Sequence, residues 1–269
     1  MRREGNLVSN ESGFSRHDGR GPRQLRRVKI ETPFLRQAEG SSSVRTGNTW
    51  VVCSATVEHR QPFFLRGTSK GWVTAEYGML PRSVPHRLSR TRPSERGAEI
   101  QRVIGRSLRS VVDLCGIPEH TITIDCDVIE ADGGTRAAAV TGAFIALCQA
   151  CRWMVQEGRI AWIPILDQVA GIGVGIVRGQ ALCDLDHEED AAADVDMNVF
   201  MAGDGRFVGI HGTAESAPFN DSQLRSLLTI ARGGLRQLFR AQARALGLDP
   251  KAPFRGTQLL SPLGKGEDG

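Results

Sequence analysis

The chain has 269 residues, of which 40% are hydrophobic and 24% are charged, so it is long enough for one large domain or two similar halves with a buried core. No stretch approaches the roughly 18 consecutive apolar residues of a membrane span, and the N-terminus lacks the apolar run of a signal peptide. The composition therefore indicates a soluble globular protein, excludes a membrane protein and favours a cytoplasmic location.

The net charge is only +4, but lysine occupies just four of the 34 basic positions, 29, 70, 251 and 265. Arginine favours forked contacts with phosphate and stacking on bases, although a GC-rich genome would also raise its count. The six cysteines lie mostly in apolar contexts without zinc or disulfide spacing, so we expect reduced core residues. Cys148 and Cys151 have the spacing of a redox motif, but they lie one turn apart in a predicted helix, which favours packing.

Residues 1–19 are polar and show no periodicity, and we expect a flexible N-terminal extension there. From residue 25 the pattern is strand-like, and residues 50–57 alternate after a turn at 46–48, which predicts a hairpin that opens an α/β layer. The main domain is expected over residues 20–246. The tail at 247–269 is rich in Pro and Gly, and we expect it to be frayed or disordered.

Residues 82–109 carry an excess of positive charge, with eight arginines against two acids, Glu95 and Glu99, and prolines keep the first part irregular. Helix periodicity over 99–114 places Arg96 at a helix N-terminus. Such a local excess needs an anionic partner, and a nucleic-acid backbone is the ordinary one. A solvated charged face is the alternative, but such faces usually interleave both signs.

A strand, a glycine turn and a helix start follow one another in the middle of the chain. Residues 121–129 alternate as in a half-buried strand, and the glycines at 133–134 end it. Helix periodicity then covers 136–157, with Thr135 as the expected N-cap. The glycines let the backbone approach a ligand, the free N–H groups of the first helical turn favour an anion, and Arg136 adds a forked donor. A phosphate site and an ordinary strand-to-helix turn both fit these residues.

The strand and helix pattern repeats weakly in the second part of the chain. The expected elements are strands at 169–177, 180–185, 194–201 and 206–211, and an amphipathic helix at 220–246 that is interrupted at 233–234.

Seven carboxylates occur within the thirteen positions 184–196. Asp196 is fixed on a strand face and Asp190 lies in the preceding turn, so we expect this pair to share a divalent cation, Mg²⁺ or Mn²⁺. A solubilising acidic turn is the alternative. The chain has no Gly-x-Ser-x-Gly, Walker or His-Glu-x-x-His motif. A phosphate cradle and a metal without an activated side chain are coherent if inorganic phosphate is itself the nucleophile.

Taken together, these segments resemble the ribonuclease PH family of phosphorolytic exoribonucleases. The resemblance covers residues 19–246, and its motifs occur in family order at 71–82, 99–102, 125–128, 131–136, 189–190, 195–198 and 212–215. It implies an α+β ribonuclease PH fold of two βαβα-type halves (ribosomal protein S5 domain 2-like) in one compact domain, and a homohexamer built as a trimer of dimers. The segment between Arg90 and Arg96 is shorter than is usual in that family.

The resemblance also implies the roles of particular residues. The family's phosphate-binding residues are matched by Arg96, Gly134, Thr135 and Arg136. The acidic pair that binds metal and assists departure of the ribose oxygen is matched by Asp190 and Asp196. The loop arginines that hold tRNA are matched by Arg82, Arg87 and Arg90.

The implied activity is that of a tRNA nucleotidyltransferase. It is a reversible, phosphate-dependent 3′ to 5′ exoribonuclease that trims tRNA precursors and other RNAs, rRNA included, and releases nucleoside diphosphates. The alternative is a catalytically silent RNA-binding ring subunit of an exosome-like assembly, against which the phosphate turn and both aspartates argue. An unrelated phosphate-binding enzyme would leave the arginine segment unexplained.

Overall fold

The computed structural model describes residues 15–89 and 95–260, and the structural statements below refer to these residues. One sheet contains β1 (Val28–Glu31), β2 (Gly40–Thr46), β3 (Thr49–Glu58), β4 (Trp72–Met79) and β5 (Thr121–Glu130). The other contains β6 (Val169–Val177), β7 (Gln180–Cys183), β8 (Val195–Ala202) and β9 (Phe207–Ala214). The α-helices are α1 (Glu95–Arg109), α2 (Thr135–Gln156), α3 (His187–Ala191) and α4 (Asp221–Ala245).

The described strands form a five-stranded sheet in the order β1-β2-β3-β5-β4 and a four-stranded sheet in the order β7-β6-β8-β9. β4 runs parallel to β5, because α1 carries the chain back to the start of the sheet between them. The neighbours in the second sheet are antiparallel. Each half therefore combines strands and helices around its own sheet, as predicted for the α+β class with two halves.

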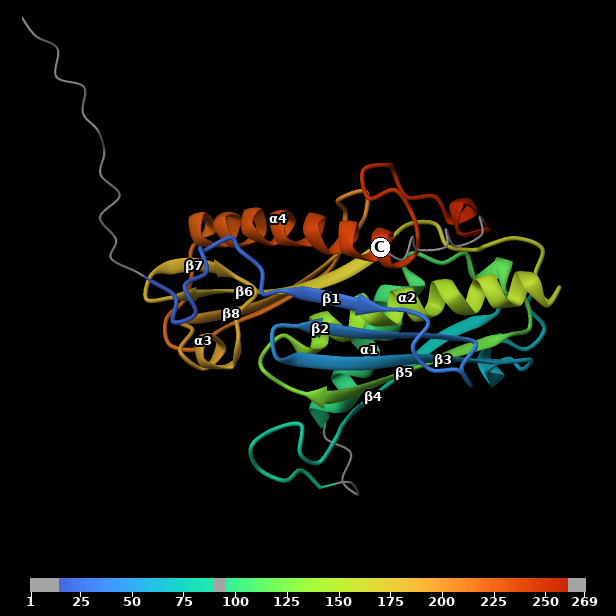
Figure 1. Ribbon diagram of the computed structural model, residues 1–269, viewed down its shortest axis with the longest axis horizontal. Helices are drawn as coiled ribbons and strands as arrows, with labels where there is room; N and C mark the ends of the chain where they lie inside the picture. Colours follow the sequence, from blue (N-terminus) through green and yellow to red (C-terminus); the bar gives the residue numbers. More distant parts are fainter. Residues whose placement is uncertain (1–14, 90–94, 261–269) are drawn as a thin grey trace, which may run out of the picture.

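α2 forms the centre of the protein, packed against β2 and β3 on one side and β6 on the other, while α4 covers the second sheet (Figure 1). The approach is close, because a Cβ on Gly142 would lie 2.9 Å from the Cys53 sulfur. By length and composition α2 also fits a membrane span, but 83% of its most apolar window is buried inside the protein. Its apolar surface on all sides is that of a core helix.

Alternation in the sequence predicted most strands correctly. The hairpin is confirmed by the pairing of Thr46 with Thr49, and the strand at 121–129 is β5, with its apolar side chains buried. β4 was missed. Its residues alternate only in part, and its partner β5 begins about forty positions later, so the strand is defined by a parallel pairing that local patterns do not contain.

Helix boundaries differ from the prediction in two places. α1 covers Glu95–Arg109 instead of 99–114, so Arg96 lies within its first turn. α4 continues through 233–234 without the predicted interruption. The reason is packing: a Cβ on Gly234 would lie 2.3 Å from Ile172 and 2.8 Å from the Cys183 sulfur, so this glycine permits close contact between α4 and the sheet.

Both predicted domain limits need correction within the described residues. Residues 15–19 belong to the fold, since Arg16 is buried and paired with Glu189. Residues 247–260 are ordered against α2 rather than frayed. The Arg152 guanidinium donates to the carbonyl oxygens of Leu246 (Nη2, 3.0 Å) and Leu259 (Nε), and the Leu259 side chain is buried.

The six cysteines are free, as predicted, although Cys115 is exposed and does not belong to the core. Cys148 and Cys151 are fully buried in α2, and burial raises the pKa of the Cys151 thiol to about 12. A thiol held in its neutral form and away from solvent is a poor nucleophile. The packing interpretation of this motif is therefore confirmed.

Arg152→Met should loosen the C-terminal segment. The substitution keeps the apolar stem but leaves the two carbonyl oxygens without their donors, so we expect the free energy of unfolding to fall by about 2 kcal/mol. Hydrogen exchange at 247–260 should accelerate, which mass spectrometry measures. Arg159→Met is the matched control, because Arg159 is exposed and lies over the Trp153 ring. Equal exchange in the two variants would contradict the anchoring role of Arg152.

Candidate active site

β5 and α2 are joined by two glycines in the left-handed region. Gly133 and Gly134 have φ angles of 71° and 70°, which glycine adopts without strain. A Cβ on Gly133 would also lie 2.7 Å from the carbonyl oxygen of Leu185, so the turn touches the segment that leads into α3. We name this turn, residues 132–136, the phosphate turn after the role that the sequence resemblance implies, and it joins the two halves of the protein.

The start of α2 differs from the prediction in its capping. Gly134, rather than Thr135, is the N-cap residue, and it has no side chain to bond the first N–H groups of the helix. Uncapped N–H groups at a helix start favour an anion. The Thr135 hydroxyl instead accepts a hydrogen bond of 2.9 Å from the hydroxyl of Tyr77 in β4. Burial raises the pKa of Tyr77, so its hydroxyl keeps the proton.

A polar cleft of about 1010 Å³ lies beside this turn, between the helices of the first half and the sheet of the second. Its charged lining residues are Arg96, Glu99, Arg102, Arg136, Asp190, Asp196 and Glu215. Within this lining the Nη1 atom of Arg136 lies 4.0 Å from the Oε1 atom of Glu99. The structure therefore brings Arg96 and Arg136 together with both predicted aspartates, although they are up to a hundred positions apart in the sequence.

Asp190 at the end of α3 and Asp196 in β8 form a coupled carboxyl pair. Burial, the negative charge of Asp190 and a hydrogen bond between the two groups raise the pKa of Asp196 to about 6, and Arg136 opposes this shift. Two carboxyl groups that compete for one proton also present the hard oxygen atoms that Mg²⁺ or Mn²⁺ takes. The pair fits a divalent cation.

The loop between β4 and α1 carries Arg82 and Arg87 on its exposed surface and projects from the body of the protein (Figure 1). Its base is fixed beside the phosphate turn, because the Ala131 N–H donates to the Ser83 carbonyl oxygen at 2.9 Å. Neither of these two arginines lines the cleft. Arg90 lies outside the described residues.

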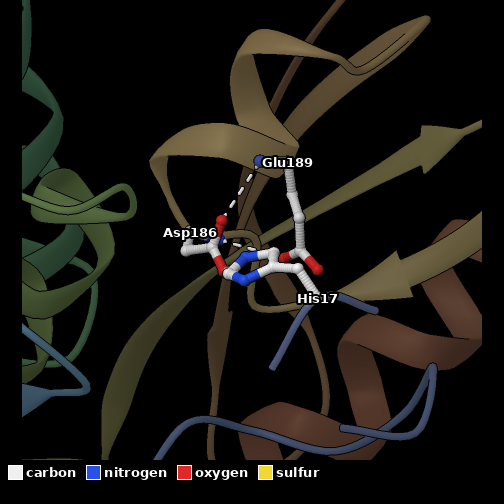
Figure 2. A group of neighbouring side chains, drawn as sticks. All are labelled: His17, Asp186 and Glu189. Carbon is white, nitrogen blue, oxygen red and sulfur yellow. Dashed lines mark hydrogen bonds and ion pairs between the residues drawn. The ribbon is translucent and has the colours of Figure 1, made fainter. Parts of the chain in front are cut away.

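His17, Asp186 and Glu189 form a second group with a spacing that could suit a metal ion (Figure 2). The carboxylate oxygens already have donors, however. Glu189 accepts from Arg16 through both oxygens, and Asp186 accepts from the Glu189 N–H through one oxygen and from Arg20 and His17 through the other. This group is an ionic network, and it does not fit a cation.

Two family models match the chain. The model of the 3′ exoribonuclease family, domain 1, matches residues 24–152, and the model of domain 2 matches residues 167–234. The chain belongs to the ribonuclease PH family. The two matched regions correspond to the two sheets, so the cleft lies where the two domains of the ribonuclease PH family meet.

Relatives and solved structures agree with this assignment. The ribonuclease PH of Moorella thermoacetica is 49% identical over 257 residues, which cover 94% of this chain and 99% of the relative. That of Solibacter usitatus is 51% identical over 231 residues, covering 84% of this chain and 97% of the relative. The Archaeoglobus fulgidus exosome with RNA bound to the active site has a TM-score of 0.73 at 23% identity, covering 83% of this chain and 91% of that chain, which shows the ribonuclease PH fold.

Sequence reasoning missed several residues of this ribonuclease PH cleft. Arg102 and Glu215 occur in the segments on which the resemblance rests, but no role was assigned to them. Tyr77 belongs to the missed strand β4, and its contact with Thr135 spans 58 positions. The available signal was the location of these polar residues inside family motifs.

The carboxyl pair makes a prediction about proton binding. In metal-free buffer Asp190→Asn should lower the pKa of Asp196 from about 6 toward its ordinary value, because the negative charge beside it is removed. Arg136→Gln should raise that pKa, because the opposing positive charge is lost. The ¹³C chemical shift of the Asp196 carboxyl carbon, followed against pH, measures both. Glu215→Gln is the control, and it should lower the pKa of Asp196 less than Asp190→Asn does. If the pKa of Asp196 moved in the same direction in all three variants, the opposing effects of Asp190 and Arg136 would be contradicted.

Proposed function

We propose that the protein is a phosphate-dependent 3′ to 5′ exoribonuclease that removes nucleotides from RNA as nucleoside diphosphates. Family membership and two relatives named ribonuclease PH support this activity. The observation that carries it is the cleft itself, which Arg96, Arg102 and Arg136 line together with the hydrogen-bonded carboxyl groups of Asp190 and Asp196. This combination suits a reaction in which inorganic phosphate is a co-substrate.

The chemistry needs little from the protein beyond positioning and charge. An oxygen of the bound phosphate attacks the phosphorus of the last phosphodiester, and the bond from that phosphorus to the 3′ oxygen of the preceding ribose breaks. The 3′ oxygen takes up a proton, and the last nucleotide leaves as a nucleoside diphosphate. Phosphate is already anionic, so no activated side chain is required. All steps can run backwards, which extends the RNA by one nucleotide.

We assign phosphate binding to the turn and the arginines near it. Arg136 at the start of α2 and Arg96 in the first turn of α1 line the same cleft. Gly134 and Thr135 directly precede Arg136 and would add N–H and hydroxyl donors alongside its guanidinium group. Forked donors of this kind stabilise the charge that develops on the phosphoryl oxygens. The Tyr77 hydrogen bond supports this role, because it leaves the Thr135 hydroxyl proton free to donate to an anion.

We assign the ribose end of the reaction to Asp190 and Asp196. Their carboxylates would hold a Mg²⁺ or Mn²⁺ ion, which supplies positive charge beside the departing oxygen. Arg82, Arg87 and Arg90 would hold the body of a transfer RNA precursor or another structured RNA. A homohexamer built as a trimer of dimers and a cytoplasmic location complete the proposal. The hexamer follows from the resemblance to the family, and the location follows from the sequence pattern, which shows the apolar run of neither a signal peptide nor a membrane span.

The products distinguish this function from simple RNA binding. A transfer RNA with a short 3′ tail, incubated with the protein and Mg²⁺, should release nucleoside diphosphates when phosphate is present and nothing when it is absent. Chromatography identifies the products. Nucleoside monophosphates formed without phosphate would show hydrolysis in place of phosphorolysis. Failure to release any nucleotide, with RNA still bound, would favour the silent ring subunit.

Two substitutions separate phosphate binding from RNA binding. Arg136→Ala should raise the KM for phosphate at least about tenfold, the loss expected for a charged hydrogen-bonding group, while the Kd for RNA changes little. Arg87→Ala should weaken RNA binding and reduce its salt dependence by about one counterion, with the KM for phosphate unchanged. Arg225→Ala controls for charge alone, since Arg225 is exposed on α4. Equal effects of the first two variants on both constants would refute the division.

A further inference from the structure

The first described residues of the chain lie across the acidic segment that leads into α3. The Arg16 side chain is fully buried and forks onto the Glu189 carboxylate, with a distance of 2.6 Å between Nε and Oε1. The same guanidinium donates to the carbonyl oxygens of Cys183 (2.9 Å) and Asp184 (3.0 Å). One side chain therefore fixes both ends of segment 183–189.

This contact bears on α3, which is too short to hold its own orientation. The helix has five residues, and a single turn is unstable without outside support. Asp186 and Glu189 form a capping box at its start, which Figure 2 shows in part. Arg16, which lies outside the helix, donates to the Glu189 carboxylate. Asp190, which lines the cleft, is the residue directly after Glu189.

Arg26 ties the same segment to the phosphate turn. Its Nη2 donates to Asp184 at 2.7 Å, and its backbone N–H donates to that carboxylate as well. In the same guanidinium group, Nη1 donates to the carbonyl oxygen of Asp132 and Nη2 also donates to that of Gly133 at 3.4 Å. The His187 N–H adds a bond of 3.3 Å to the Asp132 carboxylate. The turn of one half and the acidic segment of the other are thus joined through one buried arginine.

Stability alone does not account for these arginines. Taking charges out of water costs about as much free energy as the ion pair returns, so a buried pair contributes little net stability compared with apolar residues of similar volume. What the guanidinium groups add is geometry, because each fork fixes the direction as well as the distance of its partner. The arginines join the phosphate turn to the segment that carries Asp190, and the proposed function requires these two groups to be aligned in the cleft.

We propose that Arg16 and Arg26 are positioning residues that set the spacing between the phosphate turn and Asp190. Through that spacing they align the attacking phosphate with the departing ribose oxygen. The inference rests on the proposed function, because it takes the roles of the turn and of Asp190 from there. A displacement of about 1 Å in such a site can reduce the rate about a hundredfold, so the effect is measurable.

The test compares Arg16→Met and Arg16→Lys with Arg23→Met. Arg23 lies between Arg16 and Arg26 in the sequence. It is exposed and has no side-chain partner among the described residues. Arg16→Met should lower kcat about 10- to 100-fold and weaken Mn²⁺ binding, measured by electron paramagnetic resonance, while the KM for phosphate stays within about twofold. Arg16→Lys should recover part of the loss, since an ammonium group reaches Glu189 but cannot fork. Arg23→Met should behave as the parent protein.

Arg26→Met gives the complementary result, a raised KM for phosphate, because Arg26 touches the turn. Parent values of kcat and Mn²⁺ affinity in a folded Arg16→Met protein would overturn the inference. If Arg16→Met does not fold, Arg16→Lys becomes the deciding variant. A kcat and an Mn²⁺ affinity of Arg16→Lys equal to those of the parent protein would then overturn the inference. A parent protein that releases no nucleoside diphosphate refutes the proposed function instead. An active parent, an inactive Asp190→Asn and an unaltered Arg16→Lys refute the positioning role alone.

Discussion

The contact between the phosphate turn and the segment before α3 determines where the other parts of the active site lie. Gly133 leaves no room for a Cβ against Leu185, so the two backbones meet directly. The first half of the chain supplies the start of α2 at this point, and the second half supplies the aspartates. Because each half is built around its own sheet, this junction decides whether the two sets of groups face one another.

Charge explains why the junction needs arginine. Segment 184–190 carries five carboxylates and lies beside a helix start whose uncapped N–H groups favour an anion. Arg16 and Arg26 pair with Glu189 and Asp184, whereas Asp190 stays free to face the cleft with Asp196. The arginine-bound acids of this stretch are thus held within the fold, whereas Asp190 faces the cleft, where we propose that it meets substrate and metal. The raised pKa of Asp196 reflects its burial and the charge of Asp190.

The sequence predicted elements whose signal is local and missed contacts that are not. Alternation identified β5 and β8, and the glycine pair identified the turn, because each of these signals lies within a few neighbouring residues. The Arg16–Glu189 pair spans 173 positions, and nothing near Arg16 marks it as buried. Polar composition therefore suggested an extension over residues 1–19, of which residues 15–19 belong to the fold. Site roles came from motif order, which names residues such as Asp190 without showing what holds them.

The two ends of the site differ in how firmly the fold holds them. α2 is buried along most of its length, so the donors at its half-buried start are carried by a rigid element of the protein core. The loop between β4 and α1, which carries Arg82 and Arg87, is largely exposed. A hydrogen bond between Ser83 and Ala131 attaches it to the core near its base. Inorganic phosphate is small and identical in every cycle, and transfer of a phosphoryl group rewards fixed geometry. RNA bodies vary in shape, and in the proposed function an exposed loop adjusts to them while the chemistry at the turn stays the same.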